Sequence, residues 1–422
     1  MTNTGAGVAR IDGVVIFVNG GVDGDVAEIR IIKVYSGYCA AKIERLISPS
    51  PHRVKSGCEI SGRCGACAFR CVSYEHELEI KRRYVETSFR KQGLDIEVEA
   101  VANTGFTDRW RTKAQIPYLA ETGEAGYYAY HSNTIIPCPR CLLHADDFNE
   151  ITAFICSFLH KNGIAGVRHI YLRRGETTLT ACVVTEKRGG PWNALSDELR
   201  ARFPQITGFM LNINSSPGNV ILGTKFVTIW GEPSIDASLC GMTLKISPDA
   251  FYQINRPAAE IAFARLHESA NVREGDTVLD LFCGIGTIGL YFAKKTNGIR
   301  LIGADTTESA VRDAQQNAES NGIAGAEFIC IDAAKLDIAR FGADVIIVDP
   351  PRGGLAPELC GAIAAASPRA VAYMSCDSGT LARDCKRFAQ HGYFAGNVTP
   401  ADLFPRTGHV EAIALLSKLN TK

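Results

Sequence analysis

The feature that most constrains the fold is a regular alternation of strand-like and helix-like segments after residue 240. Strand-like runs occupy residues 277–282, 301–305, 327–331, 344–349 and 370–375. Helix-like segments occupy residues 287–295, 309–321, 357–365 and 380–390. Such alternation is typical of an α/β fold with a doubly wound parallel sheet. Because the carboxyl ends of parallel strands share one edge, we expect the functional residues to lie there.

The chain before this region predicts two further domains. Short strand-like runs at 14–18, 26–32 and 40–43, separated by Gly, Asn and Asp, indicate a small OB-like β-barrel, a fold that often holds oligonucleotides. A β-module without RNA-binding function fits the same residues. Residues 48–51 provide a linker. We therefore expect domains at residues 1–50, 51–239 and 240–422, the middle one of mixed α+β structure.

Composition limits the function classes. Lys plus Arg and Asp plus Glu number 45 each among 422 residues, so an interaction with nucleic acid would need local basic patches. Residues 1–20 lack the pattern of a secretory signal, and no apolar run is long enough to span a bilayer. The 15 cysteines are therefore expected to be reduced thiols, some of them metal ligands or catalysts, in a cytoplasmic protein.

A Gly-x-Gly-x-x-Gly turn at residues 284–289 follows the strand 277–282 and predicts a nucleotide-type cosubstrate. Asp280 would repel a dinucleotide pyrophosphate but would suit a cation such as S-adenosylmethionine. Asp305 ends the next strand, where it can accept hydrogen bonds from ribose hydroxyls. Asp349 precedes two prolines and is expected at the same edge. That Asp280 and Asp305 merely cap helices is the alternative.

Cys376 stands at the end of strand 370–375, just before a helix. A helix N-terminus stabilises a thiolate, so we expect a lowered thiol pKa and a catalytic role. Other cysteines of this domain are expected to be buried: Cys283, Cys330, Cys360 and Cys385.

A methyltransferase has a use for such a thiolate, because uracil C5 is a poor nucleophile. Addition of the thiolate to C6 makes an enolate whose C5 can attack a sulfonium methyl group. A general base must then remove the C5 proton. Glu411, which begins an apolar run at 412–416, is the candidate, and His409 could serve instead or orient the glutamate.

Four cysteines have spacing suited to a metal centre: Cys58, Cys64, Cys67 and Cys138. Cys71 and Cys141 are further thiols, and Cys141 could replace the fourth ligand. Two C-x-x-C pairs fit zinc as well as an iron–sulfur cluster, and spacing leaves both possibilities open.

Basic side chains suited to RNA occur at residues 109–113, where Arg109, Arg111 and Lys113 surround Trp110. This arrangement is suited to phosphate contacts and base stacking. Lys81, with the two arginines after it, is expected on a solvated helix face.

These motifs resemble those of the bacterial RNA (uracil-5-)-methyltransferases, in particular the iron–sulfur branch that acts on 23S ribosomal RNA. The matching segments are Cys58-x5-Cys64-Gly-Ala-Cys67-x70-Cys138, Phe251–Asn255, Asp280–Gly286, Asp349-Pro-Pro-Arg352, Ser375-Cys376-Asp377 and Phe404–Glu411. Residues 5–50 are similar to the family's TRAM domain. The segment 68–71 departs from the family's usual glutamine-containing sequence, so we expect different surroundings for the cluster.

The resemblance implies a Rossmann-type S-adenosylmethionine-dependent methyltransferase domain and a 4Fe–4S cluster on Cys58, Cys64, Cys67 and Cys138. It implies Cys376 as nucleophile, Glu411 as base and Arg111 near the target base. The positions that match contacts to S-adenosylmethionine are Gln253, Phe282, Thr287, Asp305, Asp332 and Asp349.

The expected function is therefore methylation of uridine C5 in 23S ribosomal RNA by a monomeric enzyme. A tRNA uridine methyltransferase shares the catalytic motifs and is one alternative. A non-catalytic iron–sulfur RNA-binding protein is another.

Overall fold

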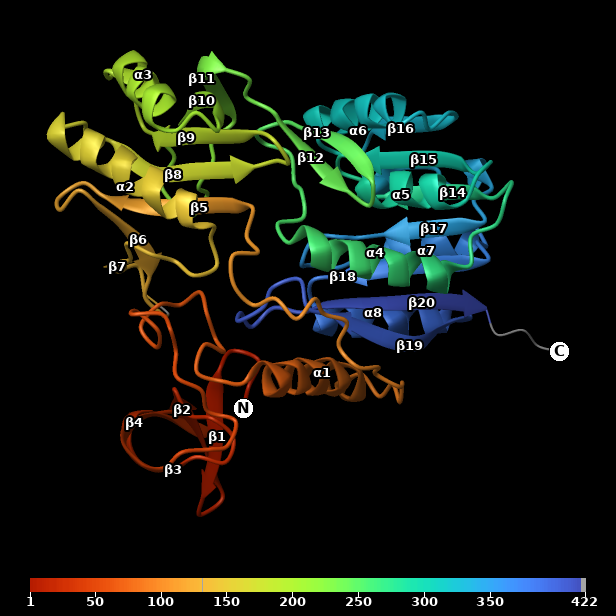
Figure 1. The fold of residues 1–422 in the computed structure, drawn as a ribbon. Helices are drawn as coiled ribbons and strands as arrows, with labels where there is room; N and C mark the ends of the chain where they lie inside the picture. The colour runs from red at the N-terminus through yellow and green to blue at the C-terminus, as the bar shows by residue number, and fades with distance from the viewer. Residues whose placement is uncertain (131, 419–422) are drawn as a thin grey trace.

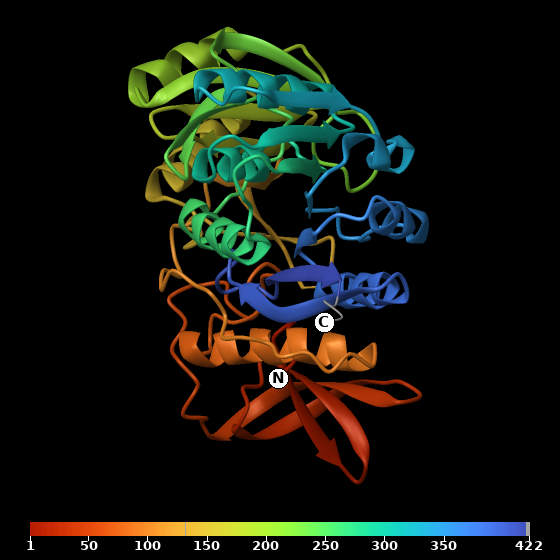
Figure 2. The same cartoon turned by 90° about the vertical axis from the view of Figure 1, so that its right-hand side faces the viewer.

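The computed structural model describes residues 1–130 and 132–418, arranged as three larger sheets and one two-stranded sheet (Figures 1 and 2). The N-terminal strands form a barrel-like sheet in the order β1-β2-β4-β3. Their bounds are β1 (Ala6–Ile11), β2 (Val14–Asn19), β3 (Val26–Val34) and β4 (Tyr38–Ser48). In the described part of the chain, no helix combines the length and apolarity needed to cross a bilayer.

The middle region is a seven-stranded sheet in the order β11-β10-β9-β8-β5-β6-β7. Its strands are β5 (Lys113–Leu119), β6 (Glu124–Tyr128), β7 (Ile135–Pro137), β8 (Val167–Arg174), β9 (Leu179–Thr185), β10 (Ile206–Ile213) and β11 (Lys225–Gly231). Helices α2 (Asp146–Lys161) and α3 (Trp192–Arg202) pack on it through a core that includes Ile155 and Leu199. A hairpin, β12 (Ile235–Leu239) and β13 (Met242–Ile246), packs into the core of the next sheet.

The C-terminal sheet has the order β16-β15-β14-β17-β18-β20-β19 and confirms the predicted α/β Rossmann-type fold. Its strands are β14 (Thr277–Leu281), β15 (Arg300–Asp305), β16 (Ala326–Cys330), β17 (Val345–Val348), β18 (Ala370–Ser375), β19 (Tyr393–Ala401) and β20 (Glu411–Lys418). The first five are parallel, whereas β20 runs antiparallel to both β18 and β19.

Alternating side chains divide the core of this sheet between its two faces. On β17, Val345 and Ile347 face one core, and Ile346 and Val348 face the other. The first core is covered by α4 (Arg256–Ala270), α5 (Thr287–Lys295) and α6 (Glu308–Ser320). The second is covered by α7 (Pro357–Ala365), α8 (Ser378–Gln390) and the short helices η1 (Ala333–Lys335) and η2 (Ile338–Phe341).

Helix α1 (Tyr74–Lys91) lies between the N-terminal sheet and the β19–β20 edge of the C-terminal sheet (Figures 1 and 2). The expected solvated position of Lys81 is wrong, because this side chain is completely buried. Its ammonium group donates to Glu77 Oε1 at 2.8 Å and to Asp402 Oδ1 at 2.7 Å. Tyr74 donates to the other oxygen of Asp402 at 2.9 Å. A buried charge cluster thus fixes α1 to the loop that precedes β20.

Arg406 extends this cluster to the cysteine-rich segment. Its backbone N–H donates to Glu77 Oε1 at 2.7 Å, and its guanidinium donates to the carbonyl of Val72 at 2.8 Å. In return the N–H of Phe69 donates to the Arg406 carbonyl at 3.1 Å. Residues between Phe69 and Lys81 therefore hold the loop that precedes Glu411.

We predict that Lys81→Met lowers the free energy of unfolding by about 3–5 kcal/mol, because it leaves the buried carboxylate of Asp402 without a counter-charge and Glu77 with Arg406 alone. Chemical denaturation measures this loss. The matched control is Arg90→Met on the same helix, whose exposed ion pair with Glu86 should contribute less than about 1 kcal/mol. Equal effects of the two substitutions would contradict the structural role of the cluster.

Candidate active site and cysteine cavity

The register of β18 and β20 brings the predicted nucleophile and base together. Ser375–Ala412 is the last pair of this antiparallel ladder, so Cys376, which follows Ser375, and Glu411, which precedes Ala412, lie at the same end of the two strands. The charge of Glu411 acts on the Cys376 thiol. Asp349 follows β17, which pairs with β18, so a second carboxyl group lies at this edge.

Burial of these acidic groups together makes ionisation difficult. Burial, and next the charges of Glu411 and Asp349, raise the pKa of the Cys376 thiol to about 11, while Arg352 acts in the opposite direction. Burial raises the pKa of Asp349 to about 7. Burial and then Asp349 raise the pKa of Glu411 well above its usual value. The expected lowering of the thiol pKa by the helix N-terminus is therefore wrong, since desolvation and the neighbouring carboxyl groups outweigh it.

The glycine turn lies at the carboxyl ends of the same strands. Phe282, Gly284 and Gly286 have positive φ angles of 66°, 54° and 83°. A positive φ is costly for a phenylalanine and marks a backbone held by its surroundings. Asp280 is buried and accepts from the N–H of Gly289 at 2.9 Å, and burial raises its pKa to about 8. Asp280 thus holds the turn to α5 through one oxygen, and its expected electrostatic role toward a cation stays a prediction.

The other residues expected to contact the cosubstrate have different local surroundings. Asp305 accepts from the N–H groups of Gly284 at 3.0 Å and Thr307 at 2.8 Å. Thr287 is the first residue of α5, and Asp332 is exposed and caps η1 through Ala334. Gln253 is buried.

The segment around Gln253 is tied to two other parts of the site. Asn255 donates to the carbonyl of Leu403 at 3.0 Å, in the loop before Glu411. The carbonyl of Ile254 accepts from the N–H of Thr112 at 3.0 Å, in the basic segment.

The basic segment presents its cations but not its aromatic ring. Trp110 is only 7% exposed and packs with Leu143 and Ile254, so the expected base stacking on this ring is wrong. Arg109 is exposed and pairs with Asp146, whereas Arg111 is partly exposed and lies over the Trp110 ring.

An exposed aromatic ring nevertheless lies beside Lys113. The lysine ammonium is 5.7 Å from the centre of the Phe251 ring, which is 62% exposed. Burial, and next the charges of Arg173 and Arg111, lower the pKa of Lys113 to about 8. Lys113 and Phe251 thus provide a cation and an aromatic surface two residues from Gln253.

The predicted metal ligands converge on one small cavity of about 50 Å³. It is lined by the thiols of Cys58, Cys64, Cys67, Cys138 and Cys141. The side chains of Arg70, Arg111 and Tyr127 also line it. Burial raises the pKa of Cys67 and that of Cys138 to about 12. Among the described residues, no three His, Cys, Asp or Glu side chains are close enough to share a single metal ion. The thiols are therefore grouped but not arranged for one ion.

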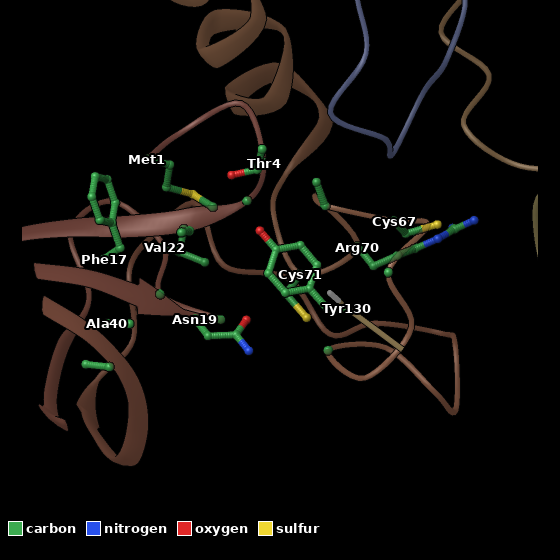
Figure 3. Close-up of a pocket in the computed structure, with 18 of the residues that line it drawn as sticks. Met1, Thr4, Phe17, Asn19, Val22, Ala40, Cys67, Arg70, Cys71 and Tyr130 are labelled. Atoms are coloured by element: carbon green, nitrogen blue, oxygen red, sulfur yellow. The ribbon is translucent and has the colours of Figure 1, made fainter. Parts of the chain in front are cut away.

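A larger cavity of about 370 Å³ separates the cysteine-rich segment from the N-terminal sheet (Figure 3). Phe17, Asn19 and Val22 contribute from the barrel side, and Cys71 and Tyr130 from the other side. In this view the Arg70 side chain extends beside Cys67, away from the barrel residues. The wall between the two cavities therefore contains Arg70.

Comparison with known proteins identifies the parts of the chain. Residues 273–392 match the methyltransferase domain family, and residues 2–43 match the TRAM domain family. An uncharacterized RNA methyltransferase of Listeria monocytogenes is 34% identical, covering 99% of this chain and 95% of the relative. One of Caldanaerobacter subterraneus is 32% identical, covering 99% and 96%. The Pyrococcus abyssi tRNA (uracil-54, C5)-methyltransferase, solved with S-adenosyl-L-homocysteine, superimposes with a TM-score of 0.77 at 26% identity and covers 98% and 99% of the two chains.

A TRAM domain joined to a Rossmann-type methyltransferase domain defines the class of protein. With relatives above 30% identity over almost its full length, the chain belongs to the RNA methyltransferase family.

Sequence reasoning missed two features of the site. Arg352 affects the pKa of Cys376 and that of Glu411, and only its place in the Asp349-Pro-Pro-Arg352 motif could have indicated this. Cys330 is exposed, against expectation, because its strand β16 is at the edge of the sheet, whereas Cys283, Cys360 and Cys385 are buried as expected.

We predict that Glu411→Gln makes the protein more stable near pH 8. An unfolded glutamate ionises near pH 4.3, whereas the folded carboxyl group has a raised pKa. The wild type therefore loses stability relative to the variant as pH rises from about 4 toward the folded pKa. Thermal unfolding at several pH values should show a difference that grows with pH. Exposed Glu274→Gln is the control, and a constant difference would contradict the raised pKa.

Proposed function

We propose that this chain methylates C5 of uridine in 23S ribosomal RNA, with S-adenosylmethionine as methyl donor. The observation that supports the chemistry best is that Cys376 and Glu411 lie at the same end of β18 and β20, where the charge of Glu411 acts on the Cys376 thiol. The glycine turn lies at the same edge of the sheet. In the Pyrococcus enzyme of the same overall architecture, the bound product of the methyl donor supports this choice of cosubstrate.

The reaction uses the two residues in sequence. The Cys376 thiolate forms a bond to C6, and the ring electrons shift to give an enolate. C5 then takes the methyl group from the sulfonium, which leaves as S-adenosylhomocysteine. Glu411 accepts the C5 proton, the C6–S bond breaks, and its electron pair returns to sulfur.

The acidic surroundings of Cys376 fit a cationic methyl donor. Without a cation, the thiol and the carboxyl groups of Asp349 and Glu411 oppose one another's ionisation. A sulfonium charge beside Asp349 would favour the ionised form of each of them. Arg352 contributes in the same direction. Thiolate formation would therefore be coupled to binding of the methyl donor.

For RNA, we propose that Arg109, Arg111 and Lys113 contact phosphates close to the target uridine. The ribosomal target follows from the cysteine motif that this chain shares with the ribosomal branch of the family. The architecture of the Pyrococcus tRNA enzyme favours tRNA as the second candidate substrate. A monomeric state and a cytoplasmic location stay predictions.

Trapping on 5-fluorouridine RNA tests substrate and mechanism together, because fluorine replaces the proton that must leave C5. With S-adenosylmethionine, wild-type protein should form a denaturation-resistant adduct with a 23S transcript and not with a tRNA transcript. Cys376→Ala should form none, and exposed Cys330→Ala should behave as wild type. On ordinary RNA, Glu411→Gln should lose about 10²–10⁴-fold in turnover and accumulate the methylated adduct.

Equal adduct formation by wild type and Cys376→Ala would refute the mechanism. Adducts with tRNA alone would leave the chemistry intact and replace the proposed substrate.

We further propose that the cysteine cavity holds a 4Fe–4S cluster. Thiolates are its usual ligands, and a cluster of several irons spreads its ligands more widely than a single ion does. Such a cluster would cross-link residues 58–67 to the segment after β7. The methyl transfer itself needs no electron from it.

Two cysteines, Cys138 and Cys141, are candidates for the fourth ligand, and packing favours Cys141. Cys141 packs with Cys67 against the Trp110 core, and Asn149 holds its backbone N–H at 3.0 Å. Cys138 also borders a separate cavity beside α2.

We predict that Cys141→Ser, like Cys64→Ser, abolishes iron and sulfide binding and the visible absorption of anaerobically purified protein. Cys138→Ser should retain them and serves as the matched control. The reverse result would restore Cys138 as ligand, and zinc without sulfide would replace the cluster.

A further inference from the structure

Arg70 is a buried cation whose hydrogen-bonding capacity is largely unused. Its side chain is 7% exposed, and one terminal nitrogen pairs with the half-exposed Asp108. Within the part of the chain that the structure describes, its Nε and its second terminal nitrogen have no oxygen acceptor, and their polar neighbour is the Cys67 thiol. Burying unpaired donors of a charged group costs free energy, so a hydrogen-bond acceptor at this position would stabilise the folded protein.

The unused nitrogens belong to a side chain that lines the cysteine cavity. Figure 3 shows Arg70 extending beside Cys67. Cys67 lines the same cavity, and its side chain is a hydrogen-bonding neighbour of Arg70. The cavity that Arg70 borders thus has thiols as its principal polar groups.

A metal centre bound by four thiolates is anionic, since four negative sulfurs exceed the charge of either a 4Fe–4S core or a zinc ion. Such a centre would provide the acceptors that Arg70 lacks. We propose that Arg70 donates N–H···S hydrogen bonds to the metal centre of this cavity, compensating its negative charge. This inference rests on the metal centre proposed above, and it concerns a position where the chain departs from the family's usual glutamine-containing segment.

The same arginine links the centre to the basic segment. Asp108, its ion-pair partner, precedes Arg109, whose N–H donates to the carbonyl of Leu142 at 2.9 Å. The N–H of Arg111 donates to the carbonyl of Leu143 at 3.0 Å. The segment proposed to contact RNA is therefore built on the residues that follow Cys141, and Arg70 connects the two.

The proposal predicts that Arg70→Gln changes the unfolding temperature differently in metal-loaded and metal-free protein. In the loaded protein, Arg70→Gln should lower the unfolding temperature because the centre loses its donor. In chelator-treated protein, the same substitution should leave the unfolding temperature unchanged or raise it, because an uncompensated buried charge is removed. Arg70→Lys should fall between wild type and Arg70→Gln, and exposed Arg63→Gln is the control on the same segment.

The reduction potential gives a second readout that a merely structural arginine would not move. Loss of a nearby positive charge disfavours the more negative reduced state, so Arg70→Gln should shift the midpoint potential of an iron–sulfur centre to lower values at unchanged iron content. An unchanged potential, with equal changes in unfolding temperature for loaded and metal-free protein, would overturn the role of Arg70.

The experiments distinguish failure of the catalytic proposal, of the metal centre and of the role of Arg70. If wild-type protein binds neither iron nor zinc, the metal centre is refuted and Arg70 with it, while the adduct assay still decides the catalytic proposal. If zinc binds instead of iron, the comparison of unfolding temperatures decides the role of Arg70.

Discussion

The buried ammonium group of Lys81 is the interaction on which the geometry of the site most depends. It joins Glu77 on α1 to Asp402, in the loop that leads into Glu411. Arg406 joins the carboxylate of Glu77 to Val72 in the cysteine-rich segment. Removing one partner would leave an uncompensated charge in the interior, which costs more than a surface ion pair contributes. The position of the base is therefore set by residues more than 300 positions earlier in the chain.

A second constraint acts at the carboxyl edge of the C-terminal sheet, where acidic groups are concentrated. Asp349, Cys376 and Glu411 lie together because β17, β18 and β20 are neighbours. Their raised pKa values show that the protein alone stabilises their charged forms poorly. A site of this kind favours a cationic ligand.

The sequence could predict the parts of this arrangement that follow from local periodicity. The alternation of strands and helices places Cys376 at a strand end, and the apolar run after Glu411 predicts β20. Sequence patterns could not predict that Lys81 is buried or that Trp110 is covered, because both depend on partners distant in the chain. The predicted lowering of the Cys376 pKa was wrong for a similar reason. The helix terminus is a local effect, whereas burial and the charges of Glu411 and Asp349 come from the tertiary fold.

The cysteine-rich segment shows why a cross-link would be valuable in this fold. Between β4 and α1 the chain forms turns and isolated bridges but no helix or strand. Its apolar packing is limited to small groups, such as Phe69 with Val22 and Ile80. A segment that buries so little apolar surface has little to offset its conformational entropy. Yet its Val72 carbonyl accepts from the Arg406 guanidinium, and its Arg70 pairs with Asp108 beside the basic segment. The metal centre proposed above would cross-link the chain close to these contacts.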